Sequence, residues 1–212
     1  MSDEKQLCTR IERASPSEWR RILKNDQQWA RLTTRLEGVK ITPRYSGSTL
    51  SDFKPSYANL SNKSLYIGGM PGVGKTHLMA ALALRQTILD LKNESDVERP
   101  YARFISVPNL LAKIKSTFDK ASEETEETVF NEYANALWLY LDDFGTEQSS
   151  DWTFLTLYRI IDHRWNQRYP IVVSGNNSLE SIAGGYSERI ASRLMGMTEI
   201  IELQGSDRRE KK

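Results

Sequence analysis

The chain has 212 residues, of which 39% are hydrophobic and 27% charged, a composition typical of one globular domain plus a shorter segment and not of a disordered chain. Its longest apolar run, Leu78–Leu84, has seven residues, whereas a membrane-spanning helix needs about 20; with a lone Cys8 and no signal-peptide pattern, we expect a cytoplasmic protein with no membrane partner. The 29 basic and 28 acidic side chains nearly cancel, so net charge favours neither nucleic acid nor any other partner.

Residues 1–41 predict a helical extension ahead of the main domain. Ser15 and the proline that follows it are typical of a helix start, and apolar side chains then recur at helical spacing through residues 16–37. Trp19 and Trp29 lie in this helix. Their apolar face has two open interpretations: it docks onto a partner protein, or it packs on the core of this protein.

From residue 42 to residue 212 the pattern predicts a single α/β domain in which strands alternate with helices. The expected strands are Leu65–Ile67, Tyr101–Val107, Leu137–Leu141, Ile171–Val173 and Glu199–Leu203. The expected helices are Lys75–Leu91, Asn109–Phe118, Trp152–Trp165 and Ser187–Leu194. The acidic stretch 123–127 indicates a solvated loop or a helix end. Such alternation favours a parallel five-stranded sheet within a three-layer α/β fold.

A glycine-rich loop lies between the first expected strand and the helix that follows it. The loop reads Gly69-Met70-Pro71-Gly72-Val73-Gly74-Lys75-Thr76 and matches the pattern G-x-x-x-x-G-K-[ST]. Glycines let successive backbone N–H groups face a phosphate, and the helix N-terminus adds partial positive charge. Lys75 is placed to reach the β- and γ-phosphates, and the Thr76 hydroxyl to ligate Mg²⁺. The sequence therefore predicts a nucleotide-binding P-loop.

Two carboxylates, Asp142 and Asp143, follow the buried strand Leu137–Leu141. Because ligands of open α/β sheets bind at the carboxyl ends of the strands, these acids are expected beside the P-loop. We expect Asp142 to hold the Mg²⁺ and Asp143 to polarise the attacking water. An Asp-Asp pair after a strand is also a common turn, so this prediction depends on the P-loop upstream.

Polar residues after the next strand, and a basic helix beyond it, extend the candidate site. Asn176 follows Ile171–Val173, where an amide could orient the attacking water, although asparagines there are also usual turn formers. Arg189 and Arg193 lie four residues apart on one predicted helical face. One of them could reach the γ-phosphate of a neighbouring subunit; the alternative is a solvated basic face.

The strings that carry a family resemblance are Pro43–Tyr45, Gly72–Leu78, Leu141–Glu147, Ser174–Asn176, Glu188–Leu194 and Gly205–Arg209. Taken together they resemble the AAA+ ATPases of the DnaA/DnaC branch, in particular the DnaC/DnaI-type replicative helicase loaders, with the IstB-type transposition ATPases beside them. The resemblance covers about residues 42–209. It implies an AAA+ P-loop core with ATP and Mg²⁺ as cofactors, and an ATPase that hydrolyses ATP slowly as a switch.

The same resemblance implies roles for individual residues. Asn176, rather than the adjacent Asn177, is implied as the sensor of the γ-phosphate. Arg193 is implied as the arginine finger that completes the site of a neighbouring copy, with Arg189 beside it, which requires a homo-oligomer. At the two ends of the core, His77 continues the P-loop match, and Arg209, or alternatively Arg208, corresponds to the basic residue that ends the family core.

The family also places a DNA-contacting helix after the second strand, here residues 107–120. This region holds Lys113, Lys115, Lys120 and Phe118. Lysines neutralise phosphates and an aromatic ring stacks on a base, so the residue types suit single-stranded DNA. Three lysines on an exposed helix are also a common way to keep a protein soluble, and the pattern alone leaves both interpretations open.

Three functions are compatible with the sequence. The first is an ATP-dependent helicase loader that binds single-stranded DNA and delivers a DnaB-type replicative helicase. The second is an IstB-like ATPase that regulates a transposase. The third is a P-loop kinase of a small molecule; against it, the chain offers the acid pair and Asn176 but no evident substrate lid. The resemblance favours the first.

Overall fold

The structure is a computed structural model that describes residues 18–19, 26–53, 57–60, 62–89, 101–119, 121–148, 150–185 and 188–209. The strands are β1 (Leu65–Gly68), β2 (Ala102–Ser106), β3 (Trp138–Phe144), β4 (Ile171–Gly175) and β5 (Glu199–Glu202). The helices are α3 (Asp26–Val39), α4 (Lys75–Leu89), α5 (Val107–Ser116), α6 (Glu126–Ala134), α7 (Asp151–Gln167), α8 (Leu179–Gly185) and α9 (Glu188–Met197). Three 3₁₀ turns, Pro43–Tyr45, Leu50–Asp52 and Ala58–Leu60, lie between α3 and β1.

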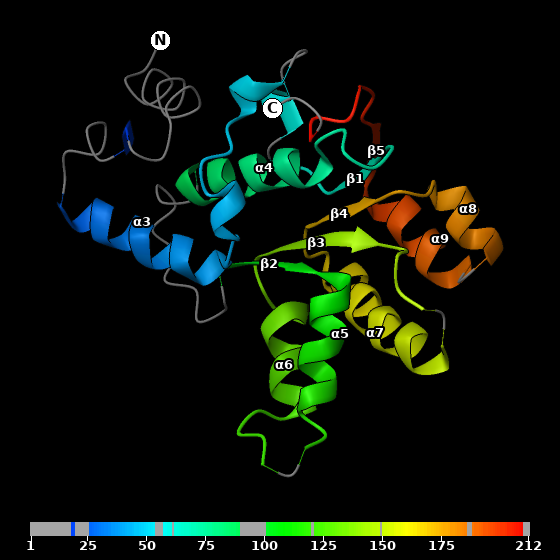
Figure 1. The fold of residues 1–212 in the computed structure, drawn as a ribbon. Coiled ribbons are helices and arrows are strands. Elements are labelled where there is room, and N and C mark those ends of the chain that lie inside the picture. The colour runs from blue at the N-terminus through cyan, green and yellow to red at the C-terminus, as the bar shows by residue number, and fades with distance from the viewer. Residues whose placement is uncertain are drawn as a thin grey trace.

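The strands form one parallel sheet in the order β2-β3-β4-β1-β5, with helices on both faces (Figure 1). Neighbouring residues of β1 supply opposite faces, because Leu65 and Ile67 pack in the cluster with α4, whereas Tyr66 packs in the cluster with α5, α7 and α9. The expected three-layer α/β fold with five parallel strands is therefore confirmed. A parallel sheet brings the carboxyl ends of all its strands to one edge, where the P-loop, Asp142, Asp143 and Asn176 lie.

Two helices are absent from the sequence prediction. The acidic stretch that we expected to be a loop or a helix end contains the first turn of α6, where Thr125 caps the helix and Glu126 and Glu127 follow it. Acidic side chains in a first turn are favourable because they face the positive end of the helix dipole. The second unpredicted helix is α8, which is only seven residues long. Helices as short as this carry too few apolar positions for periodicity to identify them.

The predicted N-terminal helix is described only in part, because residues 16, 17 and 20–25 lie outside the described ranges. Trp19 is 3% exposed and packs with Leu32 of α3 and with Leu84 and Ile88 of α4. Trp29 is partly buried against the same cluster. Both tryptophans thus pack on the protein's own core, which is the second of the two interpretations above. None of the described helices has the length and apolar character needed to cross a membrane.

A buried arginine joins three segments at the edge of the sheet opposite the P-loop. Arg164 of α7 is fully buried. Its guanidinium donates hydrogen bonds to the backbone carbonyls of Tyr133, Ala134, Ala136, Leu137 and Pro170. These carbonyls belong to the end of α6 and to the turns that lead into β3 and β4. The planar fork of an arginine can satisfy several carbonyls at once, which a lysine ammonium cannot do in the same geometry.

A second polar cluster joins α3, β2, α5 and α6 through Glu132. The Glu132 carboxylate accepts hydrogen bonds from Lys40 at 2.9 Å, Arg103 at 2.7 Å and Lys113 at 2.6 Å. Burial alone would raise the pKa of Glu132, but the hydrogen bonds from these three cations outweigh it and lower the pKa from 4.5 to about 2. The charge of Lys113 is therefore used inside the protein, where Glu124 also contacts it at 3.2 Å.

We expect Arg164→Met to lower the free energy of unfolding by about 3 kcal/mol or more, because several buried carbonyls lose a charged donor at once. Urea unfolding followed by circular dichroism measures the effect. Arg159→Met is the matched control on the same helix, since Arg159 forms an exposed ion pair with Glu126 and such pairs contribute about 1 kcal/mol or less. Equal losses in both variants would contradict the role given to Arg164.

We expect the Glu132 cluster to make stability sensitive to acid. The pKa of Glu132 is lower in the folded protein than the ordinary 4.5, so its contribution is complete above about pH 5 and is lost as the pH falls towards 2. Glu132→Gln should lower stability at pH 7 and flatten the decline between pH 5 and pH 2. Unfolding curves over this range, with Glu127→Gln on the exposed side of α6 as the control, measure the difference.

Candidate nucleotide site

The loop between β1 and α4 has the backbone conformation that its glycines permit. Gly69 and Gly72 have φ angles of +141° and +82°, in a region that other residues rarely adopt. A Cβ at Gly69 would overlap the carbonyl oxygen of Leu203, and a Cβ at Gly72 would overlap the carboxylate of Asp207. The loop is therefore enclosed by the chain that follows β5, and glycine is required at both positions for space as well as for φ.

Lys75, the first residue of α4, is the central cation of the site. Its side chain is buried, and its ammonium donates to the carbonyl oxygens of Gly69 at 2.7 Å and Met70 at 2.9 Å, and to Oδ1 of Asn176 at 2.7 Å. Burial lowers the pKa of Lys75, while the charges of Asp143 and Asp142 act in the opposite direction. The lysine thus joins the P-loop to the end of β4, and the acids of β3 compensate its charge.

A cavity of about 340 Å³ opens beside this lysine. The P-loop and α4 contribute Pro71, Gly72, Gly74, Lys75, Thr76 and His77 to its wall. Segments distant in sequence contribute Arg44, Tyr45, Asp143, Asn176, Arg208 and Arg209. The structure therefore brings together residues that we predicted from four separate strings, and its cationic side chains suit a polyanionic ligand.

Three predicted loop residues do not line the cavity. The carbonyls of Gly69 and Met70 face Lys75 instead, and the Met70 side chain is 72% exposed. Val73 is buried in the core cluster beneath the loop. Val73 can therefore contribute to ligand binding only through its backbone.

The two acids at the end of β3 differ in environment. Asp142 is buried and accepts a hydrogen bond from the Ser174 hydroxyl of β4. Burial raises the pKa of Asp142, although the hydrogen bonds from Ser174 and Thr76 act to lower it. Asp143 is exposed, lines the cavity and has a φ of +56°, which is unusual for a residue with a side chain. We did not predict Ser174, although a serine at the end of a buried strand is an available signal.

The residues predicted to hold Mg²⁺ fit that ion. The Thr76 hydroxyl acts to lower the pKa of Asp142, which indicates that the two side chains are close enough to share one cation. Both are oxygen ligands of the kind that Mg²⁺ prefers, and Mg²⁺ usually takes one or two carboxylates and completes its shell with phosphates and water. Consistent with such a sparse set, no group of three or more His, Cys, Asp and Glu side chains suited to a metal occurs among the described residues.

The structure distinguishes the two asparagines after β4. Asn176 lines the cavity and its Oδ1 accepts from Lys75. Asn177 turns away from the cavity, because its carbonyl accepts a 2.6 Å hydrogen bond from the Tyr66 hydroxyl and its side-chain Nδ2 lies 3.5 Å from the carbonyl oxygen of Gly145. We chose Asn176 over Asn177 as the sensor of the γ-phosphate, and of the two it is Asn176 that lines the cavity.

The two arginines of α9 do not reach the cavity of their own chain. Arg193 donates to Asp162 of α7 at 2.9 Å and lies 5.7 Å from the centre of the Trp165 ring. Arg189 is exposed. Neither is among the residues that line the cavity. The structure therefore does not bring either arginine together with the other predicted site residues.

The segment after β5 lies across the P-loop. The Arg208 N–H donates to the carbonyl oxygen of Gly72 at 3.0 Å, and the Arg208 guanidinium lies 4.4 Å from the centre of the Phe53 ring. Arg209 also lines the cavity, and its charge contributes to lowering the pKa of Lys75. The structure thus places both candidate arginines, 208 and 209, at the cavity.

Tyr45, an aromatic residue before β1, contributes to the remaining wall, and Phe53 lies behind it against His77. The rings of Tyr45 and Phe53 meet the His77 ring edge-on, at 6.4 and 5.5 Å between centres. His77 also contacts the Asp52 carboxylate at 2.6 Å. Arg44 and Tyr45 were quoted above only for the family resemblance, and their place in the cavity wall is a result of the tertiary structure.

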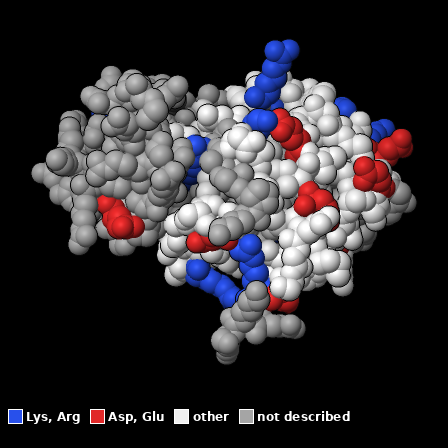
Figure 2. All heavy atoms as spheres, turned by 90° about the horizontal axis from the view of Figure 1, so that it is seen from above, with Lys and Arg blue, Asp and Glu red and all other residues white. Residues whose placement is uncertain are grey.

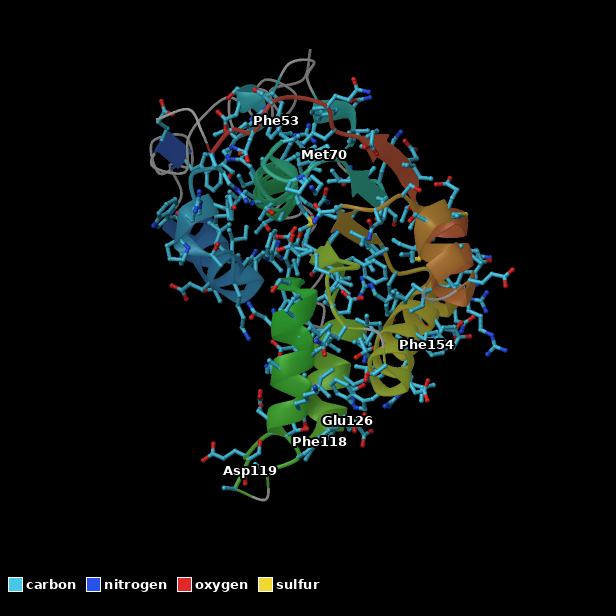
Figure 3. All side chains as sticks on the ribbon, turned by 45° about the vertical axis from the view of Figure 1, so that its right-hand side comes forward. Phe53, Met70, Phe118, Asp119, Glu126 and Phe154 are labelled. Atoms are coloured by element: carbon cyan, nitrogen blue, oxygen red, sulfur yellow. The ribbon has the colours of Figure 1, made fainter. Side chains whose placement is uncertain are left out.

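Phe118, one of the predicted DNA-contacting residues, lies far from the cavity. Figure 3 shows Phe118, with Asp119 and Glu126, at the free end of the α5–α6 pair, and Met70 of the P-loop near the opposite end of the molecule. Phe118 is 58% exposed and meets Trp152 edge-on at 6.1 Å. Lys115 lies 4.9 Å from the centre of the same Trp152 ring.

The basic character of this region is weaker than the sequence suggests. Lys113 is engaged with Glu132 and Glu124, and Lys120 lies outside the described residues. The opposite end of the molecule, seen from above in Figure 2, has basic and acidic side chains interspersed on the surface drawn in colour. Lys115 and Phe118 are thus the described residues of the predicted set that remain exposed for DNA.

No family model matches the chain. Among curated proteins it is similar to the replicative helicase loader DnaC of Escherichia coli strain K12, with 27% identity over 131 residues that cover 62% of this chain and 49% of the relative. It is also similar to the replicative helicase loader DnaI of Bacillus subtilis strain 168, with 26% identity over 174 residues, covering 76% of this chain and 52% of the relative. The chain thus spans about half the length of these curated relatives.

Solved structures of the same group have the same fold. The DnaC helicase loader aligns with a TM-score of 0.60 and 24% identity over 77% of this chain and 100% of that one. The replication initiator DnaA, bound to AMPPCP and single-stranded DNA, aligns with a TM-score of 0.60 and 19% identity over 79% of this chain and 52% of that one. The AAA+ P-loop fold and the predicted resemblance to DnaC/DnaI-type loaders are thereby confirmed.

Proposed function

We propose that this protein is an ATP-dependent helicase loader, which binds ATP with Mg²⁺ and delivers a DnaB-type replicative helicase to single-stranded DNA. The observation that carries the proposal is the cavity at the carboxyl edge of the sheet, where Lys75, Asp143 and Asn176 converge. A P-loop beside a buried cation and an acidic strand end is the arrangement that phosphoryl-transfer chemistry uses. The replicative helicase loaders among the relatives support the biological role.

In the proposed reaction each polar group of the cavity has one task. Lys75 stabilises the charge of the β- and γ-phosphates. Thr76 and Asp142 hold Mg²⁺, which when bound neutralises charge that develops on the phosphates. Asp143 polarises the attacking water, and Asn176 orients it. The aspartate at position 143 reaches less far than a glutamate would, which supports slow hydrolysis that acts as a switch.

The proposal includes a homo-oligomer in which Arg193 completes the site of a neighbouring copy. The placement of Arg193 and Arg189 outside their own cavity supports an action on another subunit. An arginine supplied by a neighbour offsets transition-state charge only when the subunits are assembled. Hydrolysis would then depend on assembly, so that ATP binding favours the oligomer and hydrolysis releases it.

Single-stranded DNA enters the proposal as the track on which the subunits assemble. The likeness to DnaA solved with single-stranded DNA supports a fold suited to this ligand. On this chain Lys115 and Phe118 are the exposed candidates for phosphate and base contacts. Lys113 is a weaker candidate, because a DNA phosphate would have to compete with two carboxylates.

The two alternative functions have less support. The relatives described above are helicase loaders, which favours a replicative helicase over a transposase as the partner. A small-molecule kinase would need a second binding site for the phosphate acceptor. Its activity would be phosphoryl transfer to a nucleoside, without stimulation by DNA, and that assay separates it from the loader.

We expect this protein to retain a DnaB-type replicative helicase in a pull-down when ATP is present, and Lys75→Ala to lose the dependence on ATP. The substitution removes the cation at the phosphates, so ATP binding should weaken about 100-fold. Lys63→Ala is the matched control. Lys63 lies just before β1, outside the cavity, and forms an exposed ion pair with Glu199 of β5. Fluorescent-nucleotide titration and the pull-down are measured on the same preparations.

Two results would contradict the proposal. If the unaltered chain bound no ATP, the site assignment would be wrong. If it bound ATP but retained no helicase under any nucleotide condition, the nucleotide site would stand and the loader role would fall.

We expect Arg193→Ala to lower ATP hydrolysis by about 1,000-fold or to the detection limit, with ATP affinity nearly unchanged. Asp162→Asn is the control, since it removes the same ion pair but leaves the arginine in place. Mixing Arg193→Ala with Asp142→Asn subunits should restore part of the activity, because one supplies an intact pocket and the other an intact arginine. No recovery in the mixture would contradict action on a neighbouring copy.

A further inference from the structure

Two loops carry the groups that face the proposed attacking water. The segment 143–147 comprises the end of β3 and the loop after it, and it carries Asp143; the loop 176–178 follows β4 and carries Asn176. Both side chains line the cavity. They lie on different strands, so their separation depends on whatever joins the two loops.

A buried tyrosine is the first connection between these loops and the rest of the sheet. Tyr66 of β1 is 1% exposed, and its hydroxyl donates to the carbonyl oxygen of Asn177 at 2.6 Å. It passes beneath the end of β4, because a Cβ at Gly175 would overlap the Tyr66 hydroxyl and crowd the carbonyl oxygen of Phe144. Glycine at 175 therefore leaves room for the tyrosine to hold the residue next to Asn176.

A carboxylate organises the other loop. Glu147 Oε2 accepts from the N–H of Gly145 at 2.9 Å. Burial raises the pKa of Glu147, although backbone N–H groups of the same loop act to lower it. The Gly145 carbonyl in turn lies 3.5 Å from Nδ2 of Asn177. Asp143 and Gly145 have φ angles of +56° and +83°, and the aspartate keeps this costly conformation only where its surroundings hold it.

The protonation state of Tyr66 suits its contact with Asn177. Burial, followed by the charges of Glu202, Glu147 and Glu180, raises the pKa of Tyr66 above its ordinary range. Tyr66 therefore remains a hydrogen-bond donor at physiological pH. Neither Tyr66 nor Glu147 lines the cavity, so any effect of these residues on the reaction must pass through the residues that they hold.

We propose that Tyr66 and Glu147 are positioning residues for ATP hydrolysis: together they hold the loop of Asp143 against the loop of Asn176 and so set the place of the attacking water. This inference rests on the proposed ATPase function and deepens it. Displacement of a catalytic group by about 1 Å can cost about 100-fold in rate while substrate binding is retained. The expected signature is therefore a loss in kcat without a matching loss in ATP affinity.

The test uses Tyr66→Phe and Glu147→Gln in the full chain. Each variant should lower kcat about tenfold, equivalent to about 1.4 kcal/mol, and change the Kd of ATP less than threefold. Tyr133→Phe, also a buried tyrosine of the same core cluster, and Glu180→Gln, exposed at the start of α8, should leave both constants unchanged. Amide hydrogen exchange should rise in residues 143–147 and 175–178 in both test variants.

The outcomes separate this inference from the function on which it rests. If the unaltered chain hydrolyses ATP and both variants keep its kcat and its exchange rates, the positioning role is wrong. If kcat, ATP affinity and thermal stability fall together in the variants, Tyr66 and Glu147 are merely structural and the inference is overturned. If the unaltered chain hydrolyses no ATP, the proposed function fails, whereas the exchange measurement still decides whether the two loops are held by these residues.

Discussion

The buried ammonium of Lys75 is the interaction on which the site depends. A cation removed from water must be compensated. The Lys75 ammonium donates to two P-loop carbonyls and to Asn176. The acids of β3 lie close enough to oppose the effect of burial on the pKa of Lys75. Meeting this requirement brings four segments together: the loop after β1, the start of α4, and the ends of β3 and β4. The same arrangement creates a cavity whose wall is cationic on one side and carries a carboxylate on the other.

Residues outside the cavity also support this edge of the sheet, some at the opposite ends of the strands and some beside the cavity. Arg164 satisfies five backbone carbonyls at the opposite edge, where a defect would shift the start of β3 and β4. Ser174 and Tyr66 act next to the cavity, since one donates to Asp142 and the other to the carbonyl of Asn177. Two hydrogen bonds support the strained φ of Asp143: its own N–H donates to the Ser174 hydroxyl, and the N–H of Gly145 donates to Glu147. Ser174 and Tyr66 thus contact residues at this edge of the sheet without lining the cavity themselves.

The charges that the sequence shows are partly neutralised by contacts within the folded protein. The net charge of +1 says little about partners, and a cluster of lysines after β2 suggested a nucleic-acid surface. In the fold, Glu132 binds Lys113 together with Lys40 and Arg103, so part of that positive charge stabilises the protein instead of facing solvent. The helices α5 and α6 are therefore fixed to α3 and β2 by ionic contacts, and an exposed aromatic residue, Phe118, is left at their free end.

The sequence by itself determined the fold class, the P-loop and the acidic strand end, because each depends on residues that are close together in the chain. The signals are strand and helix periodicity, a glycine pattern, and two carboxylates after an apolar run. It could not determine which asparagine faces the cavity, that Arg44 and Tyr45 line it, or that α6 begins within the acidic stretch. Those features depend on contacts between residues distant in the chain, such as the 111 positions between Tyr66 and Asn177. Only the tertiary structure decides these features. Burial and charge compensation depend on all segments together, and the spacing of residues along the chain does not indicate which distant residues will come into contact.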